Sequence, residues 1–231
     1  MKSPLTRIAC YLLILAIFPA CAMLTVRSDS YVRNRVVQLN RAGGSCSGVQ
    51  VVAPSGKAYV LTASHCRGLV EAGKVEATDE QNQKYFLDFI KEDPNSDLML
   101  LSSPNDNGVG IADHVRMHEH VHAMTHGHGY PTYRTDGEAL MLSRIEFAEF
   151  DLKDIADLAA CLQPKNKISQ EDASCHVAVV EMMSNASIIP GSSGGPLLNE
   201  YGSLVGIASC TDGYFGSFVT LGDIKKFLAD K

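Results

Sequence analysis

The sequence predicts an all-β protein, built as a sandwich or a barrel. Many short runs rich in Val, Leu, Ile and Thr follow one another at regular spacing, and turns containing Gly or Pro separate them. Only Leu152–Leu162 and Leu221–Asp230 carry apolar residues at helical spacing. A chain of 231 residues is long enough for one sizeable domain or for two closely packed halves.

The strand candidates begin with Val36–Leu39. The next two, Gly48–Ala53 and Ala58–Thr62, form a predicted hairpin around the turn Pro54–Lys57. The remaining candidates are, in chain order, Lys74–Thr78, Tyr85–Ile90, Leu98–Ser102, His120–Met124, Glu138–Phe147, Ala178–Met183, Gly195–Leu198, Ser203–Ser209 and Gly216–Thr220.

The stretch Leu101–Val115 is rich in Asn, Gly and Pro and contains no strand candidate after its first residues. It is therefore the best place for a boundary between two halves. We expect the main domain, residues 28–231, to divide into halves of about 28–110 and 111–231.

Residues 1–27 have the character of an export segment. Lys2 and Arg7 precede the uncharged run Ile8–Val26. The small residues around Cys21 fit signal cleavage, and Phe18–Cys21 loosely resembles a bacterial lipoprotein signal. The run is also close to the ~20 residues that span a bilayer. All three alternatives place the rest of the chain outside the cytoplasm, either secreted or anchored to a membrane through residues 8–26.

The charge and the cysteine content narrow the class of protein further. A net charge of −6 argues against nucleic acid as the main partner, because phosphate binding needs a basic face. Two of the 7 cysteines lie in the export segment, so the rest can form at most two bridges and leave one thiol over. Disulfides suit an oxidising compartment, in agreement with export.

Ser193 is a candidate nucleophile. It lies in Pro190–Pro196, where three glycines surround two serines just before an apolar strand. Glycine permits backbone conformations that aim consecutive N–H groups at one point, and the oxyanion of an acyl-transfer intermediate needs such donors. The N–H groups of Gly191 and Ser193 are the predicted donors. The alternative is a glycine-rich hairpin turn.

His65 and Asp97 are candidates for the base and for the residue that orients it. His65 directly follows an apolar strand and has small neighbours, so it has a rigid support and room to reach a serine. Asp97 directly precedes another apolar strand, at the edge of a core, where it can accept a hydrogen bond from an imidazole. Taken singly, a strand-end histidine and a turn aspartate are equally good interpretations.

Together these motifs resemble a known family. Thr62–Cys66, Asp97–Leu101 and Pro190–Pro196 are similar to the three signature blocks of the chymotrypsin-like serine peptidases, in the same chain order. The serine block Ile189–Ile207 looks more like bacterial members of the high-temperature-requirement type, and their viral relatives, than like digestive enzymes. The resemblance covers Arg41–Lys231.

The resemblance implies two antiparallel six-stranded β-barrels, with the site in the cleft between them and a helix at the C-terminus. It also implies a serine endopeptidase that hydrolyses protein or peptide substrates through an acyl-enzyme. His65, Asp97 and Ser193 would form its triad, and no cofactor would be needed. In this family, disulfides often join the positions that Cys46 and Cys66 occupy here, and another joins positions matching Cys161 and Cys175. The resemblance therefore implies the bridges Cys46–Cys66 and Cys161–Cys175.

The same resemblance assigns residues around the substrate. Ser209 matches a serine that supports the buried aspartate. Cys210 falls where an aromatic residue that binds the substrate backbone often sits, so it would line the cleft; the alternative is that Cys210 is simply a small buried apolar residue. Ser187 falls at the base of the primary specificity pocket, which disfavours Lys- or Arg-directed cleavage because Ser187 is not acidic. Ser192 stands where members activated by proteolysis carry an aspartate, so activation by a freed N-terminus is not expected.

Two other hypotheses belong to different classes. One is a non-catalytic, protease-like module that holds a peptide in the cleft; its hallmark would be loss of a triad residue, and none is lost. The other is metal binding through the histidine cluster, whose alternating members would share one face of a strand. Exposed strand and loop histidines are the simpler interpretation. The cluster comprises His114, His118, His120, His122, His126 and His128.

Overall fold

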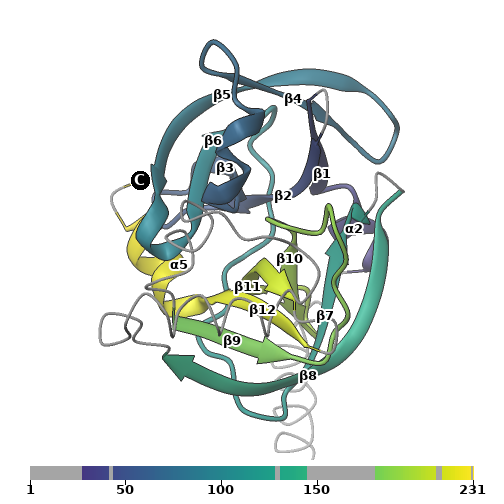
Figure 1. The fold of residues 1–231 in the computed structure, drawn as a ribbon, viewed down its shortest axis with the longest axis vertical. Helices are drawn as coiled ribbons and strands as arrows, with labels where there is room; N and C mark the ends of the chain where they lie inside the picture. The colour runs from purple at the N-terminus through teal and green to yellow at the C-terminus, as the bar shows by residue number, and fades with distance from the viewer. Residues whose placement is uncertain (1–27, 42–43, 128–130, 145–179, 212–214, 230) are drawn as a thin grey trace, which may run out of the picture.

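The computed structural model of this chain describes residues 28–41, 44–127, 131–144, 180–211, 215–229 and 231. They form two closed six-stranded barrels whose strands pair antiparallel. Figure 1 shows the first barrel, coloured purple to blue, beside the second, coloured green to yellow. The expected chymotrypsin-like fold is therefore confirmed.

The first barrel closes in the strand order β1-β2-β3-β6-β5-β4, with β1 also paired to β4. The apolar strands β3 and β6, which pair with each other, are buried along nearly their whole length. The strands are β1 (Val36–Arg41), β2 (Gly44–Val52), β3 (Ala58–Thr62), β4 (Lys74–Thr78), β5 (Lys84–Asp93) and β6 (Leu98–Ser102).

The second barrel closes in the order β10-β11-β12-β9-β8-β7. A register shift between Ala208 and Cys210 bends β11 where it passes the junction with the first barrel. The strands are β7 (His120–Thr125), β8 (Tyr133–Arg144), β9 (Val180–Ser184), β10 (Pro196–Asn199), β11 (Leu204–Thr211) and β12 (Gly216–Thr220). Every predicted strand therefore has a counterpart, with ends that differ by a few residues.

Strand β8 differs most from the prediction, which began it at Glu138. The strand begins at Tyr133 because residues 133–138 pair with β7, from Thr125 to His120. Charged residues such as Arg134 and Asp136 hide this part of the strand from a hydrophobicity pattern. Backbone hydrogen bonds to β7 still extend the strand over these residues. The predicted strand residues after 144 and the predicted helix Leu152–Leu162 lie outside the described residues.

The helices among the described residues are few and short. The C-terminal α5 (Leu221–Leu228) was predicted, and the side chain of Thr220 caps its first turn by accepting from the N–H of Asp223. The hydrophobicity pattern does not reveal α2 (Asp29–Arg33), which is mostly polar. It also does not reveal the 3-10 helices η1 (Ser64–Leu69) and η2 (Pro94–Ser96).

One apolar cluster joins the two barrels. Val36 and Leu100 of the first barrel share it with Leu198 and Leu204 of the second, and Val32 of α2 completes it. The chain therefore buries its junction in a common core rather than leaving two separate lobes. Among the described residues, no helix is both long and apolar enough to cross a membrane.

Candidate active site

Asp97 follows η2 directly and precedes β6. Its backbone is left-handed, with φ 48° and ψ 45°, a conformation that aspartate tolerates better than most residues. Its buried carboxylate accepts hydrogen bonds from Ser64 Oγ at 3.1 Å, the His65 N–H at 2.9 Å and Ser209 Oγ at 2.8 Å. These donors come from both barrels, so the carboxylate is fixed where the two barrels meet.

The charge of Asp97 is stabilised by these contacts. Burial alone would raise the pKa of its carboxyl group, but the hydrogen bonds and the charge of His65, with the bond from Ser209, lower that pKa below its usual value. Asp97 is therefore ionised at neutral pH. An ionised carboxylate has only acceptors, so the ring nitrogen that faces it must donate.

His65 is the second residue of the short helix η1, just after β3, and its ring meets the carboxylate of Asp97. Nδ1 lies 2.9 Å from Oδ2 and 3.1 Å from Oδ1 of Asp97. Burial opposes protonation of His65, but the hydrogen bond and the charge of Asp97 outweigh it and raise its pKa. Nδ1 carries the proton in the neutral ring, so Nε2 presents a lone pair on the side away from Asp97.

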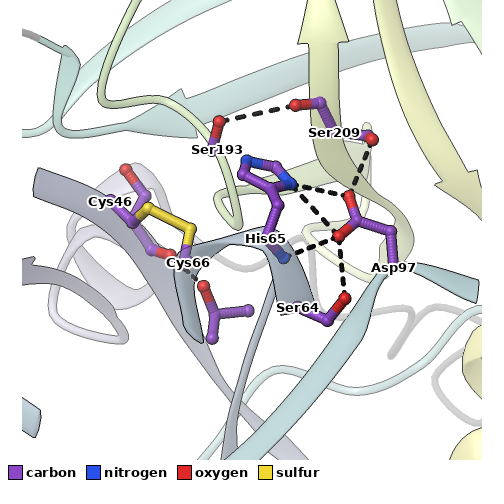
Figure 2. A network of polar contacts seen from close by, with 9 residues as sticks. Cys46, Ser64, His65, Cys66, Asp97, Ser193 and Ser209 are labelled. Carbon is purple, nitrogen blue, oxygen red and sulfur yellow. Dashed lines mark hydrogen bonds and ion pairs between the residues drawn. A yellow bond between two sulfur atoms is a disulfide. The ribbon is translucent and has the colours of Figure 1, made fainter. Parts of the chain in front are cut away.

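Ser193 lies on that far side of the ring (Figure 2). Its hydroxyl donates to the carbonyl oxygen of Ser209 at 3.4 Å, a long contact. Within the described residues, no hydrogen bond joins Ser193 to His65. The three predicted triad residues are therefore brought to one place, with the aspartate–histidine contact formed and the serine–histidine contact open.

The loop before Ser193 has the shape of a tight turn. The N–H of Ser192 donates to the carbonyl oxygen of Ile189 at 2.8 Å, and Pro190 and Gly191 are the two central residues. Gly191 has φ 92°, which the third position of a type II turn requires. In the part of the chain that the structure describes, the N–H groups of Gly191 and Ser193 have no acceptor, so both can serve an external oxyanion.

The first barrel holds this loop through Ser47 of β2. The N–H of Ser47 donates to the carbonyl oxygen of Ser193 at 2.7 Å, and its Oγ donates to that of Gly191 at 2.9 Å. Gly194, with φ 82°, lies so close that an added Cβ would meet Thr62 Oγ1 at 2.0 Å and the Ser47 carbonyl oxygen at 2.3 Å. Only glycine fits there.

The predicted substrate-contacting residues take different positions. Ser209 is buried in β11, bonded to Asp97 as described above. Cys210, next to it, is partly exposed and pairs with Ser217 of β12. Ser187 is exposed, and its carbonyl oxygen accepts from Thr135 Oγ1 at 2.8 Å. Their contacts with a substrate stay predictions.

The expected disulfide between Cys46 and Cys66 is present. It ties the start of β2 to the helix that carries His65, which braces the histidine from the side opposite Asp97 (Figure 2). The other expected bridge, Cys161–Cys175, lies outside the described residues. Cys210 forms no disulfide with any residue that the structure describes.

The histidine cluster does not converge in the described part of the chain. His122 is buried in β7, and burial, with the charge of Arg134, lowers its pKa to about 4. His118 lies on the surface near Glu138, 3.4 Å away. His126 is buried beside Thr132. No three metal-ligating side chains come together among the described residues, and His128 lies outside them.

Several residues of the site have no signal in a single sequence. Ser47, Ser64, Thr125 and Tyr133 all contact the loop before Ser193 or Asp97, yet they are ordinary strand and turn residues by pattern. The one hint in the sequence is that Ser47 follows Cys46 directly and Ser64 lies two residues before Cys66, near the cysteines expected to form a bridge. Their partners are too distant along the chain for local pattern to reveal them.

The fold has two closed antiparallel barrels, and a histidine and an aspartate from the first face a serine on a loop of the second. This arrangement defines the chymotrypsin-like class of folds. A family model described as a trypsin-like peptidase domain matches residues 46–207, which include all three of these residues. The chain belongs to the trypsin-like peptidase family.

Two curated relatives are named as probable periplasmic serine endoproteases of the DegP-like kind. The one from Chlamydia pneumoniae is 24% identical over 176 residues, which cover 74% of this chain and 30% of the relative. The one from Chlamydia muridarum is 24% identical over 168 residues, covering 71% and 28%. This chain therefore matches less than a third of each relative's length.

Solved structures of low identity share the fold. The Rv3671c protease of M. tuberculosis, in its inactive form, superposes with a TM-score of 0.65 at 17% identity, covering 91% of this chain and 95% of the other. The serine endoprotease from Yersinia pestis gives a TM-score of 0.64 at 19% identity, covering 87% and 64%. At this identity they support the architecture alone.

Proposed function

We propose that this protein is a serine endopeptidase that acts outside the cytoplasm on protein or peptide substrates. The observation that carries the proposal is the buried Asp97 carboxylate, which holds Nδ1 of His65 at 2.9 Å and so turns Nε2 of the ring toward the side where Ser193 lies. Membership of the trypsin-like peptidase family supports it.

In the proposed acylation step, the hydroxyl of Ser193 leaves its long contact with Ser209 and donates to Nε2 of His65. The serine oxygen attacks the peptide carbonyl carbon, and the proton passes to Nε2. Asp97 stabilises the imidazolium that results, as its effect on the pKa of His65 indicates. The histidine then gives this proton to the leaving amine, and an acyl-enzyme remains.

The negative charge that develops on the substrate oxygen needs donors. The N–H groups of Gly191 and Ser193 are held by the turn and by Ser47, and they have no competing acceptor in the described chain. Two such preorganised donors are the usual complement of an oxyanion hole. Water then attacks the acyl-enzyme by the same route in reverse, and no step needs a cofactor.

The proposed location follows from the export segment and from the relatives. Residues 1–27 have the features of a signal or an anchor, and both curated relatives are named as periplasmic. The Cys46–Cys66 disulfide agrees with an oxidising compartment. The exposed, uncharged Ser187 supports a pocket that does not select Lys or Arg.

The test is covalent labelling of the full-length protein with a fluorescent fluorophosphonate, beside the variants Ser193→Ala and His65→Ala. We expect labelling of the wild type, none of Ser193→Ala and very slow labelling of His65→Ala. Ser203→Ala is the matched control, because this serine lies in the turn before β11, away from His65 and Asp97, and should label like the wild type.

Two results would contradict the proposal. Equal labelling of wild type and Ser193→Ala would show reaction at another residue. An unlabelled wild type that still binds peptides, measured by fluorescence anisotropy, would support a non-catalytic peptide-binding module instead.

A further inference from the structure

A cluster of three hydroxyl groups lies beneath the loop that carries the oxyanion donors. Ser192 Oγ lies 2.9 Å from Thr125 Oγ1 and 2.7 Å from the hydroxyl oxygen of Tyr133. The N–H of Ile189 also donates to Ser192 Oγ, at 3.1 Å. We call Thr125, Tyr133 and Ser192 the hydroxyl cluster.

The hydrogen bonds of Ser192 use its full capacity. A serine hydroxyl has one proton to donate and two lone pairs that accept. It accepts from Ile189 N–H and from one neighbouring hydroxyl, and it donates to the other hydroxyl. Ser192 is only 1% exposed, so any of these bonds, if lost, would leave a buried polar group without a partner.

The cluster rests on a rigid support. Thr125 ends β7 and Tyr133 begins β8, and the two residues lie directly opposite each other in the antiparallel pair. Thr125 also packs under the loop, because a Cβ added at Gly195 would meet its Cγ2 at 2.5 Å. At Gly127, an added Cβ would meet both Ile189 and the ring of Tyr133 within 2.8 Å. The tyrosine ring and the loop are therefore in close packing.

The bonds of Ser192 set the orientation of the Gly191 N–H. The backbone bond from Ser192 N–H to the Ile189 carbonyl oxygen and the return bond from Ile189 N–H to Ser192 Oγ close the turn twice. In a type I turn, the peptide between Pro190 and Gly191 would be rotated by about half a turn. The Gly191 N–H would then point to the opposite face of the loop. Anchoring Ser192 holds both ends of the turn and so opposes that rotation.

We propose that Thr125, Tyr133 and Ser192 are positioning residues, which hold the Gly191 N–H toward the substrate oxyanion through neutral hydrogen bonds alone. The inference rests on the proposed function. It implies that this chain has a preformed oxyanion hole that needs no charged partner for Ser192, and it assigns a role to Tyr133, which touches neither His65 nor Ser193 in the described contacts.

The variants that test this remove single hydroxyls without changing shape. Tyr133→Phe and Thr125→Val each delete one hydroxyl from the cluster, and Thr125→Ser restores it. Tyr85→Phe is the matched control, because the Tyr85 hydroxyl is buried in the first barrel and has no hydrogen-bond partner among the described residues. Tyr133 is only half-buried, so Tyr133→Phe should fold as the wild type does.

The readouts are kcat and KM for the fluorogenic peptide that the full-length wild type cleaves best in a peptide library, and inhibition by the aldehyde of that peptide. The aldehyde carbon bonds to Ser193 Oγ, the serine proton passes to His65, and the aldehyde oxygen becomes the oxyanion. We expect Tyr133→Phe and Thr125→Val to lower kcat about tenfold or more, with KM within about twofold. Loss of a whole oxyanion donor costs about 10²–10³-fold.

The aldehyde should lose affinity by a similar factor in these two variants. Thr125→Ser, which keeps the hydroxyl but loses the packed methyl group, should retain most of the kcat and aldehyde affinity that Thr125→Val loses, and Tyr85→Phe should match the wild type. If Tyr133→Phe and Thr125→Val keep the wild-type kcat, or lose kcat without losing aldehyde affinity, the inference is wrong and the proposed function stands. A wild type that neither cleaves nor binds the aldehyde overturns the proposed function and the inference together.

Discussion

At the scale of single residues, Asp97 has the most constrained position in the site. Its left-handed backbone aims the carboxylate at η1, and donors from three residues occupy its oxygens. The sequence placed this aspartate correctly at the start of an apolar strand. It did not reveal the support from Ser64, because nothing in the pattern around Ser64 distinguishes a donor to a carboxylate from an ordinary helix-start serine.

The pH dependence of the reaction follows from His65. The proposed base must be neutral, and Asp97 raises the pKa of His65 above its ordinary value of 6.5. The imidazole therefore stays protonated to a higher pH than a free histidine does. We expect the acid limb of kcat/KM to lie above pH 6.5, measured as the pH profile with a fluorogenic peptide.

Asp97→Asn provides the comparison for that profile. The variant keeps the burial of His65 but removes the charge that raises its pKa, so the acid limb should move to lower pH. Because the histidine tautomer is then no longer fixed, kcat should also fall about 10⁴-fold. Asp88→Asn, on an exposed carboxylate in β5, should change neither quantity. An acid limb that is the same in Asp97→Asn would contradict this explanation.

A comparison of Gly56 with Gly194 distinguishes the cost of backbone strain from the cost of a steric clash. Gly194 and Gly56 both have φ 82°, but a Cβ at Gly56 meets nothing within 4 Å, whereas one at Gly194 meets Thr62 and Ser47. We expect Gly56→Ala to lower the free energy of unfolding by about 1 kcal/mol and keep full activity. Gly194→Ala should lose more stability and nearly all labelling by a fluorophosphonate. Equal effects in thermal unfolding and labelling would argue that only strain matters.

At the scale of elements, the Cys46–Cys66 bridge links β2 to η1. The two residues are 20 positions apart, and closing a loop of this size stabilises a protein by about 3 kcal/mol in the chain-entropy account. We expect the double variant Cys46→Ala/Cys66→Ala to lose about that free energy in urea unfolding, because its unfolded chain is less restricted. Cys210→Ser, which breaks no described disulfide, is the control.

The same double variant shows whether the bridge positions His65. Because η1 carries the histidine, we expect the rate of fluorophosphonate labelling to fall under conditions in which the variant is still folded. A folded variant that is labelled at the wild-type rate would mean that packing around η1, rather than the bridge, positions the histidine.

Sequence pattern predicted most of the strands because alternation and turn residues act locally. It located β3, β4, β6 and β12 to the residue. It shortened β8, where charged side chains occupy a paired strand, since the pairing partner β7 rather than local hydrophobicity extends that strand. It also did not predict α2, whose docking depends on Val32 entering a core built by both barrels.

At the scale of the whole molecule, the two barrels share one apolar cluster and one site. Leu204 of the second barrel is fully buried in that cluster with Leu100 of the first. We expect Leu204→Ala to lower the free energy of unfolding by about 2–5 kcal/mol and to leave a single cooperative transition. The unfolding transition should be measured by far-UV circular dichroism and by hydrogen exchange, because the chain has no tryptophan whose fluorescence could report unfolding. Separate transitions for the two barrels would contradict this.

The sequence by itself predicted the all-β class, most of the strand positions and the three residues proposed to be catalytic, because alternation, turn chemistry and motif are written in neighbouring residues. The tertiary structure alone decided how Ser47 docks the serine loop and how Thr125 and Tyr133 hold Ser192. It also showed that Ser193 has yet to turn toward His65. The bonds from Ser47 Oγ to Gly191, and of Thr125 and Tyr133 with Ser192, join residues 144, 67 and 59 positions apart, so they form only once the chain has folded.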